Sequence, residues 1–139
     1  MRRYEEKVQN IDVSANLLKD PLYVKGDSSQ LIQVFMNIML NAEEALKESR
    51  GGNIVITTQI DGEWVKVSIA DDGTGIAEEN LSQVFYPFFT TKQAGGGTGL
   101  GLSTCYGIVT AHNGLIRAEN NEMGGATFTV ELPLATTRS

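Results

Sequence analysis

Hydrophobic residues in the first half of the 139-residue chain follow a helical period between Asp27 and Lys47. They recur every three or four positions, which predicts an amphipathic helix with one buried face. Asp27, followed three residues later by Gln30, is typical of a helix N-terminus, and Gly51-Gly52 is a stop signal. The apolar face consists of Leu31, Val34, Phe35, Ile38, Met39, Ala42, Ala45 and Leu46.

Alternating apolar residues after this helix predict two strand pairs. Ile54–Ile60 and Val65–Ile69 flank Asp61-Gly62, a strong hairpin signal. A second pair is expected at 115–119 and 126–132, and short extended pieces at 11–13 and 22–25. Between the pairs we expect a loop at 71–76, a short helix at 77–84, no regular period over 85–98, and a helix at 99–111 that ends at Asn113-Gly114.

This order of elements predicts an α+β fold. Specifically, it predicts a two-layer α/β sandwich, in which helices cover one face of a mixed, mostly antiparallel sheet. The length fits a single domain, residues 1–139. We expect residues 1–10 to be the end of an upstream linker or helix, and residues 134–139 to be a frayed tail.

Composition and charge narrow the class of protein. The net charge of −6 argues against a nucleic-acid partner. No apolar run is long enough for a membrane span and the N-terminus lacks a signal peptide, so we expect no direct membrane contact. A single cysteine, Cys105, excludes an internal disulfide and a cysteine metal cluster, which favours a reducing, cytoplasmic location.

Eight of the 15 glycines lie between residues 73 and 107, an unusual concentration. Gly95–Gly101 opens the predicted helix at 99–111, where free backbone N–H groups could cradle an anion such as phosphate. The lysine of a Walker loop is missing and no strand directly precedes the glycines, so this is neither a P-loop nor a Rossmann fingerprint. The alternative is a flexible surface loop.

Asn37 and Asn41 lie four residues apart on an otherwise apolar helix face. Buried amides need partners, so they either cap neighbouring loops or hold a metal or phosphate through their carbonyl oxygens. Asparagine oxygens suit a hard cation such as Mg²⁺.

Asp71 and Asp72 follow a strand and precede the Gly73-Thr74-Gly75 turn. An Asx-turn is the simple interpretation. The two glycines and the apolar Ile76 favour close approach of a ligand, since a carboxylate there could accept a hydrogen bond from an exocyclic amine such as that of adenine.

Aromatic residues cluster in Val84–Lys92, next to a polar Thr-Thr-Lys end. The aromatic side chains are expected to pack in the core or under a lid. Lys92 either neutralises phosphate charge or is a solvated surface residue.

Together, these four blocks resemble the ATP-binding catalytic domain of sensor histidine kinases. This is the Bergerat-fold superfamily that also includes gyrase, Hsp90-type chaperones and mismatch-repair ATPases. The resemblance covers roughly residues 22–133. Within the superfamily, the sequence is similar to kinases of the nitrogen-regulation type. The matching boxes are Asn37-x-x-x-Asn41-Ala42, Asp71-x-Gly73-x-Gly75-Ile76, Phe85–Lys92 and Gly97-Thr98-Gly99-Leu100-Gly101-Leu102.

The resemblance implies ATP and Mg²⁺ as cofactors. It implies that Asn41 coordinates the metal, that Asp71 binds the adenine amine, and that residues 90–98 form a mobile lid. Asn37 and Lys92 are the implied catalytic residues. The implied nucleotide contacts are Asn37, Asn41, Glu44, Asp71, Gly73, Gly75, Ile76, Phe85, Thr90, Thr91, Lys92, Gly97, Thr98, Gly99, Leu100, Gly101 and Leu102.

Three positions depart from the family pattern. Hydrolysing relatives carry a glutamate general base where Asn37 stands, so fast ATP hydrolysis is not expected. Glu44 occupies a position that is often basic, which shifts charge neutralisation toward Lys92. Ala126 stands where Thr or Ser is frequent. Thr127 is expected to point away from the site.

The single histidine, His112, lies at the end of the predicted helix 99–111, where the helix dipole favours it, and is not expected to be the phosphoacceptor. We therefore expect one domain of a larger kinase, monomeric in isolation. Its partners would be ATP or ADP, a histidine-bearing dimerisation domain and, downstream, a response regulator. Two alternatives remain open: an anti-sigma-factor-type serine kinase and a non-catalytic ATP/ADP-sensing module of the same fold.

Overall fold

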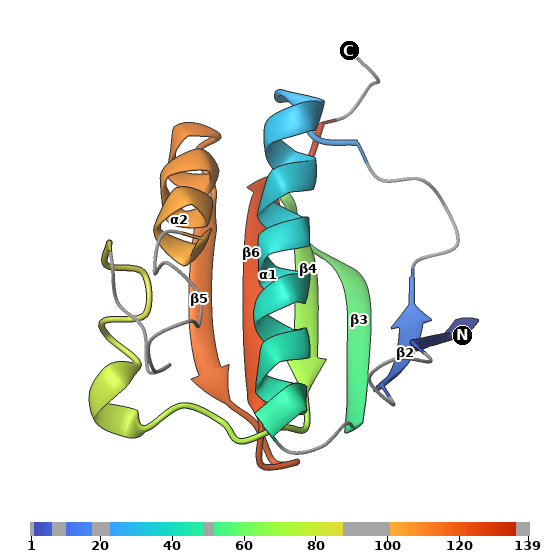
Figure 1. Cartoon of the computed structure of the whole chain (residues 1–139). Coiled ribbons are helices and arrows are strands. Elements are labelled where there is room, and N and C mark those ends of the chain that lie inside the picture. The colour runs from blue at the N-terminus through green and yellow to red at the C-terminus, as the bar shows by residue number, and fades with distance from the viewer. Residues whose placement is uncertain (1, 7–10, 18–22, 49–51, 88–100, 136–139) are drawn as a thin grey trace.

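The computed structural model describes residues 2–6, 11–17, 23–48, 52–87 and 101–135. These residues form one sheet with two α-helices side by side on one of its faces (Figure 1). The elements are β1 (Arg2–Glu6), β2 (Ile11–Asn16), α1 (Ser28–Glu48), β3 (Gly52–Asp61), β4 (Trp64–Asp71), the short 3₁₀ helix η1 (Glu78–Asn80), α2 (Gly101–Ala111), β5 (Leu115–Asn120) and β6 (Ala126–Pro133).

The six strands have the order β1-β2-β3-β4-β6-β5. The pairing of β2 with β3 is parallel and the other pairings are antiparallel, so the predicted mixed, mostly antiparallel two-layer fold is confirmed. Because β6 lies between β4 and β5, the beginning of β6 is adjacent to the end of β4, with Thr127 opposite Ala70. This pairing brings the β5–β6 turn beside Asp71.

The long helix α1 has the predicted cap and the predicted buried face. Asp27 Oδ1 accepts hydrogen bonds from the backbone N–H groups of Ser29 and Gln30, at 3.0 and 3.2 Å. This satisfies donors that have no partner within the first helical turn. The core between α1, α2 and the sheet includes Leu31, Val34, Ile38, Ala42, Leu46, Ile54, Ile69, Cys105, Val109, Phe128 and Val130.

His112 connects the end of α2 to the beginning of α1. The backbone N–H of Asp27 donates to Nε2 at 3.1 Å, and Nδ1 lies 2.8 Å from the carbonyl oxygen of Ile108. These contacts correspond to the neutral tautomer that carries its proton on Nδ1. Because both ring nitrogens are engaged by backbone groups, neither is free to act as a phosphoacceptor.

Both chain ends differ from expectation. Arg2–Glu6 is an edge strand paired with β2, rather than the end of a linker or helix. At the other end, the expected frayed tail of 134–139 is wrong for its first two residues. The N–H of Leu134 donates to the Glu63 carbonyl and that of Ala135 to the Tyr23 carbonyl, both at 2.7 Å.

Smaller differences concern the turns. The β3–β4 loop is Gly62-Glu63, one residue later than predicted, because Asp61 still pairs with Trp64. Gly62 has φ +62°, which a non-glycine residue rarely adopts. The expected short helix at 77–84 shrinks to η1 (Glu78–Asn80) followed by turns, and α2 begins at Gly101 in the described part of the chain.

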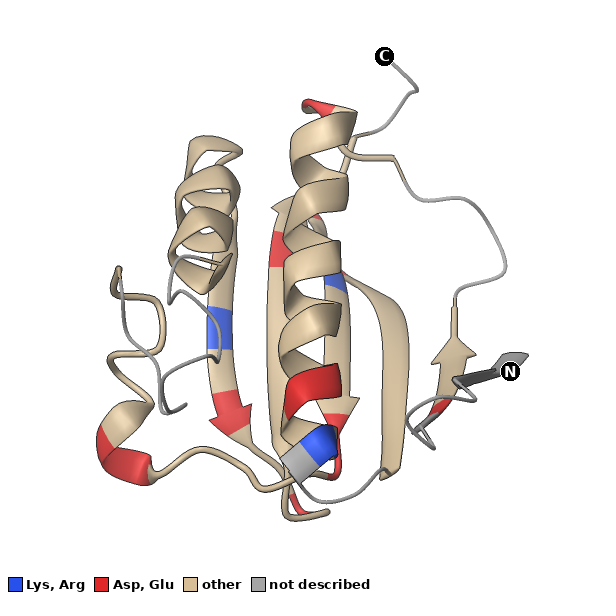
Figure 2. Ribbon diagram, in the orientation of Figure 1, with Lys and Arg blue, Asp and Glu red and all other residues tan. Residues whose placement is uncertain are grey.

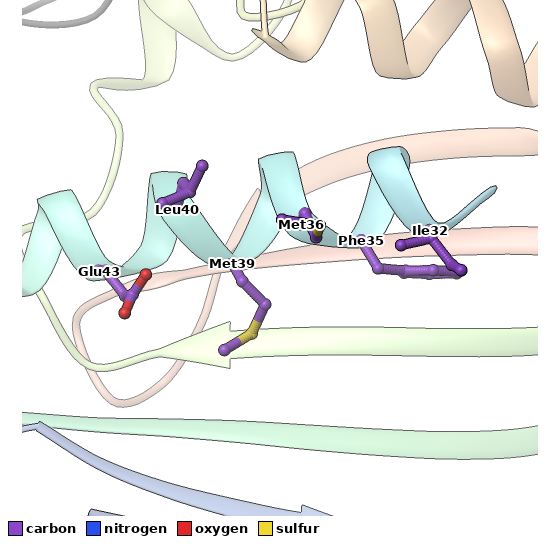
Figure 3. Close-up of a pocket in the computed structure, with 6 residues that line it drawn as sticks. All are labelled: Ile32, Phe35, Met36, Met39, Leu40 and Glu43. Carbon is purple, nitrogen blue, oxygen red and sulfur yellow. The ribbon is translucent and has the colours of Figure 1, made fainter. Parts of the chain in front are cut away.

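An apolar groove of about 330 Å³ runs along the flank of α1 (Figure 3). The predicted nucleotide contacts on α1 do not line it, so it is separate from the site described below. The groove is lined by Ile32, Phe35, Met36, Met39, Leu40 and Glu43.

In the described residues, no helix combines the length and the hydrophobicity that a membrane crossing requires.

Candidate functional site

Asp71 ends β4 as a buried carboxylate, with 1 % of its surface exposed. Its Oδ1 accepts hydrogen bonds from the backbone N–H groups of Gly73 (2.9 Å) and Ala126 (3.3 Å). Among the described residues, Oδ2 accepts no hydrogen bond. Burial raises the pKa of Asp71, and the nearby charge of Asp72 adds to this effect. A buried acceptor with one unpaired oxygen is suited to a ligand that brings its own donor.

Asp72 has a different, structural role. Its Oδ1 accepts from the backbone N–H of Asn53 (2.7 Å) and its Oδ2 from the Asn53 side-chain amide (2.9 Å). Both carboxylate oxygens therefore bind the beginning of β3. Of the acidic pair, Asp71 is the one with an acceptor available for a ligand.

The glycine loop after Asp71 packs closely against its neighbours. A Cβ on Gly73 would lie 3.0 Å from the carbonyl oxygen of Ala45 on α1. Gly75 has φ +75°, and a Cβ there would lie 2.9 Å from the carbonyl oxygen of Gly124. The absence of side chains lets the loop lie between α1 and the β5–β6 turn.

One face of α1 connects this loop with the beginning of α2. Asn37 Nδ2 donates to the carbonyl oxygen of Gly101 at 3.2 Å, while Ala45 contacts Gly73. Asn41 is halfway between them, since positions four apart share a helix face. The rise of an α-helix separates Asn37 from Ala45 by about 12 Å. The site is therefore elongated, with the Asp71 carboxylate at one end and the N-terminus of α2 at the other.

Two asparagines that sequence analysis missed hold the loop from the β5–β6 turn. Asn120 Oδ1 accepts from the N–H of Ile76 (2.8 Å), and its Nδ2 donates to the Ile76 carbonyl. Asn121 Nδ2 donates to the carbonyl of Asp71 (3.0 Å) and to Thr127 Oγ1 (3.1 Å). The one available signal was an Asn-Asn pair at a predicted turn, a position where asparagine is common for local reasons.

Of the aromatic cluster, Phe85 packs on the core as expected, whereas Tyr86 is exposed and Phe88 and Phe89 lie outside the described residues. The ring of Phe85 meets Phe128 edge-on at 6.1 Å and lies 5.9 Å from the ring of Tyr106 on α2. Phe85 was also a predicted nucleotide contact. The structure places its ring between the core and α2.

Basic residues are scarce on the two helices that border the site. The sequence of α2 has no charged residue, and the basic residue of α1 is Lys47 in its last turn. Figure 2 shows acidic ribbon in the C-terminal half of α1 and at the end of β4. An anionic ligand would therefore rely on backbone N–H groups, on a cation that accompanies it, or on residues outside the described ranges.

A family model described as "Histidine kinase-, DNA gyrase B-, and HSP90-like ATPase" matches residues 26–136. The chain belongs to this family. The match spans α1, the Asp71 loop, α2 and the C-terminal strand pair. The homology confirms the resemblance inferred from the four sequence blocks.

Relatives of this ATPase domain are histidine kinases. Sensor histidine kinase ZraS of Escherichia coli (strain K12) is 42% identical over 115 residues, which is 83% of this chain and 24% of ZraS. Sporulation kinase A of Bacillus subtilis (strain 168) is 35% identical over 129 residues, 93% of this chain and 21% of that kinase. The chain thus spans about a quarter of the length of these relatives.

Solved structures with a similar fold are also histidine kinases. The catalytic domain of histidine kinase ThkA, in a nucleotide-free form, superposes with a TM-score of 0.80 at 40% identity, covering 91% of this chain and 81% of that one. ThkA in complex with the response regulator protein TrrA gives a TM-score of 0.76 at 36% identity, covering 93% and 36%. This domain is therefore an ATP-binding catalytic domain of the histidine kinase type.

The structure distributes the predicted contacts of this ATPase domain over three places. Asp71, Gly73, Gly75 and the backbone of Ile76 form the loop. Asn37, Asn41 and Glu44 lie on α1, whereas Gly101 and Leu102 open α2, with Leu102 packed on the core. The predicted lid 90–98 lies outside the described residues, as do Thr90, Thr91, Lys92, Gly97, Thr98, Gly99 and Leu100.

Proposed function

We propose that this domain binds Mg²⁺ and ATP along α1 and transfers the γ-phosphoryl group to a histidine on a separate dimerisation domain, in the cytoplasm. The phosphoryl group would then pass to a response regulator. The observation that carries the proposal is the buried Asp71 carboxylate, whose Oδ2 accepts no hydrogen bond from the described residues. The remaining elements are arranged as an elongated nucleotide would require.

The adenine is assigned to the Asp71 end. The exocyclic amine of adenine is a donor that matches Oδ2, and a hydrogen bond to an ionised acceptor is about twice as strong as a neutral one. Gly73 and Gly75 let the loop pack against α1 and the β5–β6 turn, since a Cβ at either position would press on their backbone atoms. A loop without side chains at these two positions would let a flat base lie against its backbone. Nucleotide binding would thus supply the partner that Oδ2 lacks.

The phosphates are assigned to the other end of the line Asn37–Asn41–Ala45. The N-terminus of α2 offers backbone N–H groups and the positive end of a helix dipole. The described residues contain no cluster of three or more His, Cys, Asp or Glu side chains that could hold a metal on its own. This fits Mg²⁺, which commonly takes one or two protein ligands and completes its shell with phosphates and water. Asn41 would supply the amide oxygen.

Asn37 fits transfer to histidine better than hydrolysis. Water must lose a proton to attack phosphorus, and an amide cannot accept one. A neutral imidazole nitrogen already carries a free electron pair, so it attacks the γ-phosphorus while the bond to the ADP oxygen breaks. Asn37, which donates to the Gly101 carbonyl, would hold the helix α2 in register with α1 during this step. Lys92 is proposed to neutralise charge on the γ-phosphate.

The test combines the domain with the helical dimerisation domain of its own kinase and ATP labelled on the γ-phosphate. The expected product is label on that domain that is lost in acid and stable in base, as phosphohistidine is. Acid-stable label on serine would instead favour the anti-sigma-factor type of kinase. Bound nucleotide with no transfer would favour the sensing module. Asp71→Asn serves as the binding-deficient control.

A further inference from the structure

We propose that Asn121 and Asn120 are positioning residues for nucleotide recognition. They hold the loop from Asp71 to Ile76 in the conformation that binds the base, and they do not contact the nucleotide themselves. The inference rests on the proposed function, because it assumes that Asp71 binds the base. Asn121 holds the loop at Asp71, and Asn120 holds it at Ile76. The β5–β6 turn thereby determines where the Asp71 carboxylate points.

The Asn121 side chain uses its full hydrogen-bonding capacity. Its Nδ2 donates to the Asp71 carbonyl and to Thr127 Oγ1, and its Oδ1 accepts from the N–H groups of Met123 (3.0 Å) and Gly125 (3.2 Å). One side-chain amide therefore joins the backbone of Asp71 to the β5–β6 turn and to the beginning of β6. No rotation of the amide preserves all four bonds, since the two donors and the acceptor are distinct.

The turn and the carboxylate are also coupled directly. The N–H of Ala126, the first residue of β6, donates to Asp71 Oδ1. A Cβ on Gly125 would overlap the Asp71 carbonyl oxygen and would lie 2.5 Å from Oδ1. A change in the turn would therefore displace Oδ1, and with it Oδ2.

Asn120 provides the second attachment. Its amide pairs with both the N–H and the carbonyl of Ile76, as a neighbouring strand would. Gly75 fits beneath it, because a Cβ on Gly75 would lie 3.2 Å from Asn120 Oδ1. The loop between Asp71 and Ile76 is thus held at both ends by two consecutive residues.

The test measures selectivity for the base. Affinities of a non-hydrolysable ATP analogue and of the matching purine riboside analogue, which lacks the 6-amino group, are determined by calorimetry. The proteins are the wild type, Asp71→Asn, Asn121→Ala, Asn120→Ala and Glu122→Gln, a control at an exposed side chain in the same turn.

The wild type and Glu122→Gln should prefer the amino-bearing analogue by about tenfold or more, as one hydrogen bond to a charged group provides. Asn121→Ala should lose most of this preference while its affinity for the purine riboside analogue changes by less than about twofold. Asn120→Ala, whose side chain is exposed and whose fold is therefore expected to persist, should show the same change to a smaller extent.

Two other outcomes are informative in different ways. If both analogues weaken equally in Asn121→Ala and Asn120→Ala, or if both variants keep the wild-type preference, the positioning role is wrong. If Asp71→Asn itself keeps the wild-type preference, the assignment of Asp71 to the base is wrong and the proposed function fails at that step.

Discussion

Asp71→Asn should weaken nucleotide binding and, at the same time, raise the stability of the nucleotide-free domain. The substitution is nearly isosteric, and the amide oxygen can replace Oδ1 as acceptor for Gly73 and Ala126. The amide nitrogen then replaces Oδ2, the oxygen that accepts no hydrogen bond from the described residues. The fold keeps its contacts, whereas the nucleotide meets a donor in place of a charged acceptor.

The loss of binding follows from that one contact. A hydrogen bond to a charged group contributes about 1.5–3 kcal/mol. The affinity for an ATP analogue should therefore fall about tenfold to a hundredfold. Titration calorimetry measures this loss, and an unchanged affinity would remove Asp71 from the site.

The effect on stability has the other sign. Burial raises the pKa of Asp71 above its ordinary value of 3.8, so the native state retains this proton to a higher pH than the unfolded state does. The free energy of unfolding then decreases as the pH rises from 3.8 through the native pKa. The amide that replaces the carboxyl group cannot ionise, so the nucleotide-free variant should be more stable than the wild type near neutral pH. Urea denaturation at several pH values tests this; a variant that is less stable at neutral pH would refute the reasoning.

Four further substitutions or reactions have defined outcomes. Asn41→Ala should make nucleotide binding nearly independent of Mg²⁺ while the helix persists, since alanine favours helices; calorimetry with and without the metal decides. His112→Ala should lower the free energy of unfolding by about 1–3 kcal/mol through two lost backbone contacts, with no change in base selectivity. Gly125→Ala should abolish high-affinity binding, because its Cβ overlaps the backbone of Asp71; a variant with normal affinity would show that the turn can shift. Burial raises the pKa of the Cys105 thiol to about 11, so a thiol reagent should label it at the rate of unfolding, and rapid labelling of the folded protein would contradict its buried position.

The parts of the fold that sequence analysis predicted are those with local signals. The helix α1 has both a 3.6-residue period and a capping aspartate, and the hairpins have alternating residues around a turn. The strand β1 has neither, because Arg2–Glu6 contains no aliphatic residue and is a strand through its pairing with β2. Strand formation of this kind depends on context more than on propensity.

The candidate site likewise contains residues with a local sequence signal and residues without one. Asp71 could be predicted because an acidic residue, two glycines and a preceding strand are adjacent in sequence. Asn120 and Asn121 could not, because their partners Ile76 and Asp71 are 44 and 50 residues away. Their contacts with the loop follow from the position of β6 between β4 and β5, which no local pattern specifies.

The Gly62-Glu63 turn offers a place to attach a reporter group. It lies at the opposite end of β4 from Asp71, about 23 Å away for a strand of this length. In the described part of the chain, no atom other than those of the adjacent residues lies within 4 Å of where a Cβ on Gly62 would be. Glu63 binds Leu134 through its carbonyl and not through its side chain. Because the native thiol of Cys105 is buried, Glu63→Cys would give a single accessible thiol. A dye there would report the rotational diffusion of the domain, and so its docking to larger partners, without entering the nucleotide site.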